Sequence, residues 1–85
     1  MKTIWKFPIT VDDRFDLEMP QDARILTVQA QNGEPCLWAE VYPDNPRETR
    51  QFTVVGTGNP MPPAVTYVGT WREGSFVWHL YERAR

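Results

Sequence analysis

Hydrophobic and polar residues alternate along much of this chain with the period of two that is typical of half-buried β-strands. Trp5, Phe7 and Ile9 are separated by a lysine and a proline, and residues 15–19 repeat the alternation. Residues 51–55 then form a run rich in β-branched side chains. No window longer than about ten residues keeps helical spacing free of Pro, Gly or strand-like alternation. The pattern therefore predicts short strands and no helix of note.

Asn32-Gly33 is the clearest turn signal, because this dipeptide suits the positive φ values of a type I′ hairpin. The resulting register predicts an apolar face with three cross-strand pairs: Val28 with Leu37, Leu26 with Ala39, and Ala30 with Pro35. The opposite face then holds six side chains of mixed character: Thr27, Gln29, Gln31, Glu34, Cys36 and Trp38. The clean separation of the two faces supports this register.

Glu73-Gly74 predicts a second hairpin. With these residues at the centre of the turn, one face contains three cross-strand pairs: Trp71 with Phe76, Gly69 with Trp78, and Tyr67 with Leu80. A glycine opposite a tryptophan would let the indole cover the strand backbone. The other face is too apolar for a free surface, so we expect both sides of this hairpin to be covered.

The two hairpins and the other alternating segments define the expected fold. Residues 42–49 read as a loop, because they contain two prolines and an Asp-Asn pair. The chain is predicted to be one all-β domain of residues 1–85, a small antiparallel barrel or two-sheet sandwich of about six to seven short strands. Nothing local in the pattern chooses which face of a strand is outward.

Composition narrows the classes of partner and the compartment. The formal charge of −2 and the pI near 5.2 disfavour binding to duplex nucleic acid, which depends on clustered Lys and Arg. A single cysteine, Cys36, excludes an internal disulfide framework and suits a reducing compartment. No apolar run approaches the roughly 20 residues of a membrane span. The start of the chain does not resemble a signal peptide, so we expect a cytoplasmic protein.

Residues 54–63, V-V-G-T-G-N-P-M-P-P, contain the strongest candidate for a ligand site. The prolines prevent a following helix, which excludes a P-loop and a dinucleotide fingerprint. Two alternatives remain for the glycines. They make either a bulge or corner before a stiff crossover, or a small anion nest from the backbone amides of Gly56, Thr57, Gly58 and Asn59.

A partial repeat extends the candidate site, because Val-Gly-Thr occurs at residues 55–57 and again at 68–70, followed by Trp71. If the two strands lay side by side, the nest would lie near an indole. A donor-rich backbone beside an aromatic ring suits a nucleotide-like ligand. The alternative is that strand composition alone produced the repeat.

The sequence contains no complete catalytic or metal-binding set. His79 is the one histidine, and its predicted strand neighbours supply only a phenol, so a structural histidine is favoured. One His and one Cys cannot make a zinc site, and the acidic residues 12–18 lack the spacing of a calcium loop. We therefore expect a protein that is not an enzyme and needs no cofactor.

A binding surface is the remaining candidate. Trp38 lies on the face of the first hairpin that also carries Thr27, Gln29 and Cys36, and tryptophan is enriched among residues that dominate interface energies. This face is our candidate partner interface. Unpaired strand edges also favour a homo-oligomer.

Three sequence blocks resemble a family of very small uncharacterised proteins from bacteriophages and prophages: M-K-T-I-W-K-F-P, A-R-I-L-T-V-Q-A-Q-N-G-E-P-C-L-W-A and V-V-G-T-G-N-P. The resemblance covers nearly the whole chain and implies action inside an infected bacterium, without an established activity or functional residues. By analogy we expect an accessory protein that binds a host component, such as one of antiviral defence. The alternatives are an oligomeric sponge for a nucleotide-like signal and a virion or assembly component.

Overall fold

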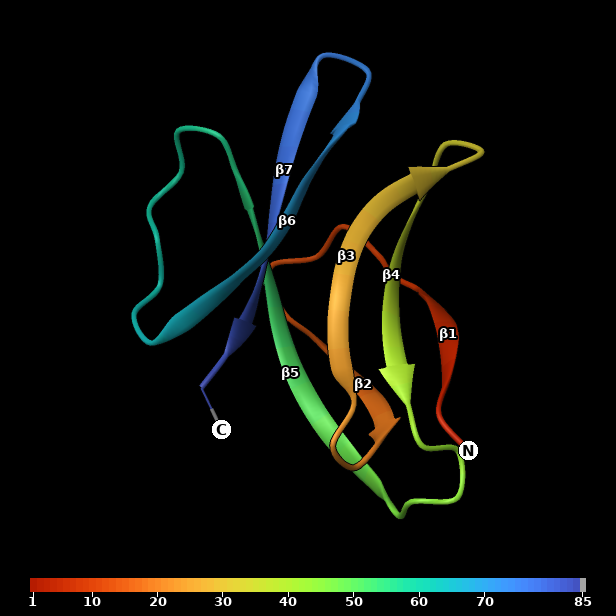
Figure 1. Ribbon diagram of the computed structural model, residues 1–85. Helices are drawn as coiled ribbons and strands as arrows, with labels where there is room; N and C mark the ends of the chain where they lie inside the picture. The colour runs from red at the N-terminus through yellow and green to blue at the C-terminus, as the bar shows by residue number, and fades with distance from the viewer. Residues whose placement is uncertain (85) are drawn as a thin grey trace.

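The computed structural model describes residues 1–84 and has seven antiparallel strands (Figure 1). In chain order the strands are β1 Thr3–Pro8, β2 Phe15–Pro20, β3 Arg24–Gln31, β4 Glu34–Val41, β5 Arg47–Gly56, β6 Val65–Glu73 and β7 Phe76–Arg83. They form a three-stranded sheet of order β1-β4-β3 and a four-stranded sheet of order β2-β5-β7-β6. Of the two architectures expected from the sequence, the two-sheet sandwich is confirmed, and residues 1–84 form no closed barrel.

The core lies between the two sheets, where alternate residues from both meet. The largest fully buried side chains there are Val28, Leu37 and Val41 from the three-stranded sheet, and Met19, Phe52 and Leu80 from the four-stranded sheet. The neighbouring residues along each strand point to the outer faces. The pairing of β1 with β4 and of β2 with β5 joins segments that are far apart in the sequence.

The first hairpin has the predicted turn, with Asn32 at φ 52° and Gly33 at φ 81°. Val28 lies opposite Leu37, and Thr27 opposite Trp38, as expected. The predicted pairing of Leu26 with Ala39 is wrong. A bulge between Ile25 and Thr27 places Ile25 opposite Ala39, so Leu26 is the extra residue and is exposed.

The turn of the second hairpin lies one residue later than predicted, so the strand pairing next to it is shifted by two residues. Glu73 pairs with Phe76, so the central residues of the turn are Gly74 and Ser75. The three predicted pairs are replaced by Trp71 with Trp78, Gly69 with Leu80 and, after a bulge, Tyr67 with Tyr81. Gly-Ser is itself a suitable turn pair, because the first residue takes the positive φ value, here 61°.

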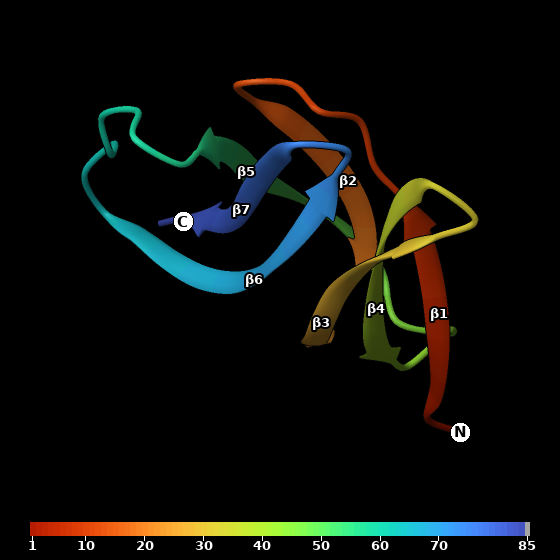
Figure 2. The same cartoon turned by 90° about the horizontal axis from the view of Figure 1, so that it is seen from above.

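Gly69 serves sheet packing rather than the covering of an indole. β3 and β6 are edge strands of different sheets, and they lie side by side in Figures 1 and 2. A Cβ atom on Gly69 would lie 2.7 Å from Cγ1 of Val28 and 3.4 Å from its backbone nitrogen. The absence of a side chain therefore lets the two edges approach.

The connection before β5 is shorter than expected. β5 begins at Arg47, so the predicted loop of residues 42–49 ends three residues early. Arg47 holds this loop through hydrogen bonds from Nη1 to the carbonyls of Pro43 (2.9 Å) and Asn45 (3.0 Å).

Candidate functional site

The four side chains of the predicted partner interface lie together on the outer face of the three-stranded sheet. Gln29 is opposite Cys36, and Thr27 is opposite Trp38. β1 completes this face, with Lys6 opposite Trp38. The structure thus brings the predicted set onto one surface, which we call the Trp38 face.

Trp38 is half-buried at the centre of this face, with polar residues around it. The Nζ of Lys6 donates a 2.9 Å hydrogen bond to Oε1 of Gln31, from β1 to β3 across the intervening β4. Cys36 is only 4% exposed, and its Sγ lies 3.7 Å from the carbonyl oxygen of Glu34. An indole with a polar rim is a common arrangement at protein interfaces, whereas Cys36 contributes little accessible surface.

An exposed ion pair lies at the end of the Trp38 face where β3 begins and β4 ends. Nε of Arg24 donates to Oε1 of Glu40 at 2.9 Å, and Lys2 lies 3.8 Å from the same oxygen. The hydrogen bond with Glu40 raises the pKa of Arg24 above its ordinary value. The hydrogen bond from Arg24 lowers the pKa of Glu40, and this effect exceeds the opposing effect of desolvation.

The glycine loop follows β5 directly, and two of its four backbone amides are used within the protein. The amide of Thr57 donates to the carbonyl of Val77 (3.2 Å), and that of Asn59 donates to the carbonyl of Gly56 (3.0 Å). Gly58 takes a φ of 93°, so the loop is a tight turn. This geometry supports the corner before a crossover and leaves fewer amides for an anion nest.

His79 has a hydroxyl partner at each ring nitrogen. Oγ1 of Thr57 lies 2.8 Å from Nε2, and Oγ1 of Thr70 lies 2.9 Å from Nδ1. The hydroxyl of Tyr67 extends the chain, 2.6 Å from the Thr70 oxygen. The prediction that its neighbours supply only a phenol is wrong, because the shifted register places Thr70 opposite His79.

The glycine turn and His79 line one pocket of about 220 Å³ on the outer face of the four-stranded sheet. Its lining includes all four residues of the predicted nest, Gly56, Thr57, Gly58 and Asn59, and also Met61, His79 and Tyr81. Sequence reasoning found the turn but missed the imidazole and the phenol, which β7 supplies.

The prediction that Trp71 lies beside the glycine turn is wrong. β7 separates β5 from β6, so the two Val-Gly-Thr segments are not neighbours. Trp71 is 4% exposed and faces the core opposite Trp78. The indole near the turn belongs instead to Trp78, whose ring would lie 3.2 Å from a Cβ atom at Gly56.

Trp78 and Phe76 line a second pocket at the turn, of about 440 Å³. Their rings are stacked, with centroids 5.6 Å apart and planes inclined by 18°. The pocket also contains Thr57 and Asn59, so the turn separates an aromatic pocket from the His79 pocket.

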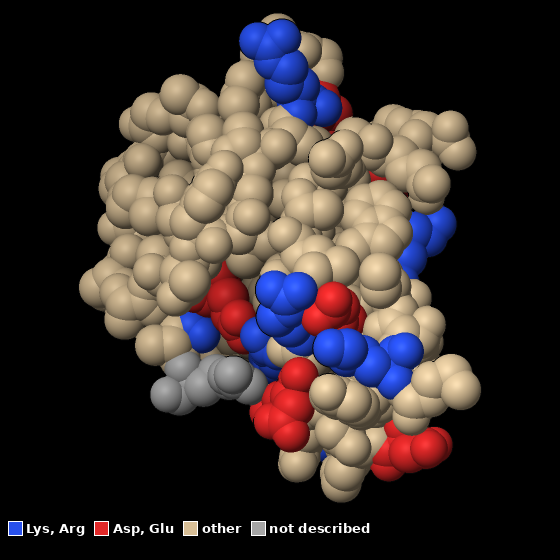
Figure 3. Space-filling view, viewed as in Figure 1, with Lys and Arg blue, Asp and Glu red and all other residues tan. Residues whose placement is uncertain are grey.

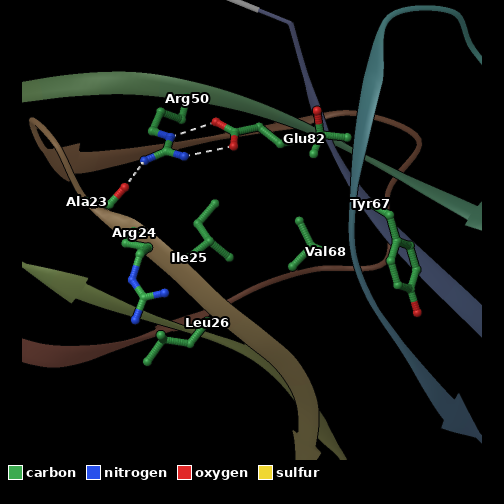
Figure 4. A pocket seen from close by; sticks show the side chains of 9 residues that line it. Ala23, Arg24, Ile25, Leu26, Arg50, Tyr67, Val68 and Glu82 are labelled. Atoms are coloured by element: carbon green, nitrogen blue, oxygen red, sulfur yellow. Dashed lines mark hydrogen bonds and ion pairs between the residues drawn. The ribbon is translucent and has the colours of Figure 1, made fainter.

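A buried ion pair lies between the sheets at the divergent ends of β3 and β6 (Figure 4). Arg50 is 5% exposed and donates to both carboxylate oxygens of Glu82, at 2.6 and 2.8 Å. Its Nη1 donates to the carbonyl of Ala23 at 2.7 Å. The hydrogen bonds with Glu82 raise the pKa of Arg50 despite the opposing effect of burial.

The pocket above this ion pair has a volume of about 390 Å³. Its walls include Leu26 and Val68, which are the extra residues of the two bulges. Figure 3 shows charged side chains of both signs side by side in the lower half of this view, whereas its upper left part is uncharged. Arg50 already has three acceptors, the two carboxylate oxygens of Glu82 and the carbonyl oxygen of Ala23. Its hydrogen bonds therefore connect β5 to β7 and to the β2–β3 turn.

The described residues 1–84 contain no group of three or more His, Cys, Asp or Glu side chains that could hold a metal ion. Within the same residues, no helix has the length and apolar character of a membrane span.

The fold and the surfaces define a small β-sandwich with several candidate binding sites. The whole chain, residues 1–85, matches the model of a family described as a domain of unknown function (DUF7352), and the protein belongs to that family. No curated protein matches the chain, and neither does any solved structure.

Proposed function

We propose that this protein is a non-enzymatic accessory binding protein of phage or prophage origin. It acts in the cytoplasm of an infected bacterium and binds a host component, one of antiviral defence, through the Trp38 face. The resemblance of its sequence blocks to small phage proteins supports the setting. One structural observation supports the surface: Thr27, Gln29 and Cys36 lie on the same face as the half-buried indole of Trp38.

The chemistry of the Trp38 face suits a protein partner. Tryptophan contributes a large apolar area together with one N–H donor, and such side chains dominate many interfaces. Lys6, Gln29 and Gln31 form a polar rim that can exclude water around the indole. The unpaired edges of β1 and β2 add surfaces for a second copy, and we propose that the protein is a homo-oligomer.

Affinity capture with a matched pair of variants tests this function. Wild-type protein and Phe76→Ala are expected to retain the same host protein from a bacterial lysate, whereas Trp38→Ala loses it. Phe76 is a suitable control because it is an aromatic residue that is 61% exposed on the other sheet. The purified pair should then bind in calorimetry. Equal capture by Trp38→Ala and the wild type would contradict the proposed surface.

The glycine turn supports a second candidate function, the sequestration of a nucleotide-like signal by an oligomer. The supporting observation is the convergence of Gly56 to Asn59 with His79 and Tyr81 on one pocket. Native mass spectrometry of protein taken from bacterial cells tests this candidate, since it measures oligomer mass and bound ligand together. We expect a retained small molecule that is lost in Thr57→Val, and a ligand-free spectrum of the wild type contradicts it.

A further inference from the structure

The connection between β5 and β6 forms a trough on the outer face of the four-stranded sheet. Figure 2 shows this connection on the side of β5 and β7 that faces away from the three-stranded sheet. Two pockets lie there, of about 500 and 220 Å³, and they share the lining residues Val55, Asn59 and Met61. We call the combined hollow the proline-loop trough, because Pro60 and Pro62 line its wider part.

Two arginines line the wide end of the trough. Arg14 precedes β2 and Arg83 ends β7, and both line the pocket of about 500 Å³. Neither forms an ion pair with any residue of 1–84, whereas Arg24 and Arg50 each have a carboxylate partner. Asp13 is the one acidic residue in this lining. Two guanidiniums against one carboxylate leave a local charge of +1 in a chain whose net charge is −2.

The narrow end is lined by side chains that form hydrogen bonds. Thr57, His79 and Tyr81 line it, and the imidazole of His79 is held by two threonine hydroxyls. The hydroxyl groups of Thr57 and Tyr81 can bind the hydroxyls of a sugar, whereas both ring nitrogens of His79 already have threonine partners. Because the amides of Thr57 and Asn59 are used internally, the turn itself is a poor anion site.

We propose that the trough binds a small phosphorylated molecule on a sugar or nucleoside carrier. Its phosphate lies against Arg14 and Arg83, where paired guanidiniums supply charge-assisted hydrogen bonds. Its sugar extends under the proline loop toward the hydroxyl groups of Thr57 and Tyr81. This inference rests on the second candidate function above, the sequestration of a nucleotide-like signal. It differs in the anion site, which is formed by the two arginines instead of the glycine amides.

NMR titration of the ¹⁵N-labelled full chain tests the proposal, with AMP, ribose 5-phosphate, inorganic phosphate and adenosine as probes. AMP and ribose 5-phosphate are expected to shift amide signals in residues 53–61 and 79–83, and to bind less tightly as salt increases. Adenosine should bind at least about tenfold more weakly than AMP, because it lacks the charged group. If inorganic phosphate binds as tightly as AMP, the trough recognises only the anion, and the proposed contact with the sugar is wrong. Phosphorylated probes that leave the trough signals unmoved overturn the whole assignment.

Variants identify the groups that bind the phosphate. Arg14→Gln with Arg83→Gln should weaken AMP binding by about tenfold or more, whereas Arg72→Gln should not, because Arg72 is an exposed arginine outside the trough. Arg14→Glu is a second variant at an exposed position, and reversal of its charge should abolish binding. Unchanged AMP affinity in both variants overturns the proposal.

The outcomes separate this inference from the function on which it rests. If protein from cells retains a nucleotide in native mass spectrometry and the double arginine variant retains it equally, sequestration stands and the arginine site is wrong. If the wild type retains no ligand from cells but binds AMP through Arg14 and Arg83, the trough is a phosphate site and sequestration is wrong.

Discussion

Gly69 of β6 lies so close to Val28 of β3 that a single added carbon would come within 2.7 Å of the valine methyl group. This contact joins edge strands of two different sheets. Gly69→Ala should therefore lower the free energy of unfolding by about 1–3 kcal/mol through overpacking. Urea denaturation of the variant measures the loss.

A double-mutant cycle separates this contact from the intrinsic effect of glycine in a strand. Val28→Ala removes the methyl group that the new carbon would meet, so Gly69→Ala should be less destabilising in that background. Strictly additive changes would show that the loss does not arise from the Gly69–Val28 contact.

Arg50 and Glu82 form a buried ion pair between the sheets. Neutralising Glu82 leaves the charge of Arg50 without a counter-charge. Glu82→Gln is expected to reduce the free energy of unfolding by about 3–5 kcal/mol, and Arg50→Met with Glu82→Leu should recover much of it. Chemical denaturation of both variants provides the measurement. Glu40→Gln is the matched control, since its ion pair is solvent-exposed and its loss should have a far smaller effect. A similar loss in both Gln variants would contradict the role of burial.

Ala64 is a non-glycine residue with a φ of 57°, at the end of the connection before β6. An L-residue is disfavoured in this left-handed region, so Ala64→Gly should stabilise the protein by about 0.5–1 kcal/mol. Thermal unfolding by calorimetry measures the shift. The same substitution at Ala30, in β3, should destabilise by a similar amount. A loss of stability in Ala64→Gly would contradict the strained backbone.

Arg24 lowers the pKa of Glu40, and this coupling predicts a pH dependence. A carboxyl with a lower pKa in the folded state adds stability above its unfolded pKa and loses it as the pH falls through the folded value. Arg24→Gln should raise the pKa of Glu40, as measured by NMR titration of its side-chain carboxyl. The stability difference between wild type and variant should disappear in acid. Lys6→Gln is the control on the same face, and an unchanged pKa in Arg24→Gln would contradict the coupling.

The two hairpins show how far local sequence determined the fold. Asn32-Gly33 fixed its register because both residues take positive φ values. Around Gly74 two turn centres were available, and residues 76–81 are apolar or aromatic on both faces. The two turn centres give pairings two residues apart, which leave each side chain on the same face, so the alternation could not distinguish them.

The bulges at Leu26 and Val68 depend on tertiary structure, because the two edge strands must bend where the sheets meet. The surroundings of His79 likewise depend on tertiary structure. Thr57, Thr70 and His79 come from three segments, and only the correct register of β6 on β7 brings Thr70 to the imidazole. The chemistry of the glycine turn was recognisable in the sequence, whereas its neighbours were not.

The pairing of β1 with β4 and of β2 with β5 also bears on how the chain folds during synthesis. The first twenty residues find their partners only after residues 34–56 have left the ribosome. Until then Trp5, Phe7 and Phe15 have no sheet to cover them. Such distant pairing is expected to make folding slow for a chain of 85 residues, and the nascent amino-terminal segment is where chaperones would bind.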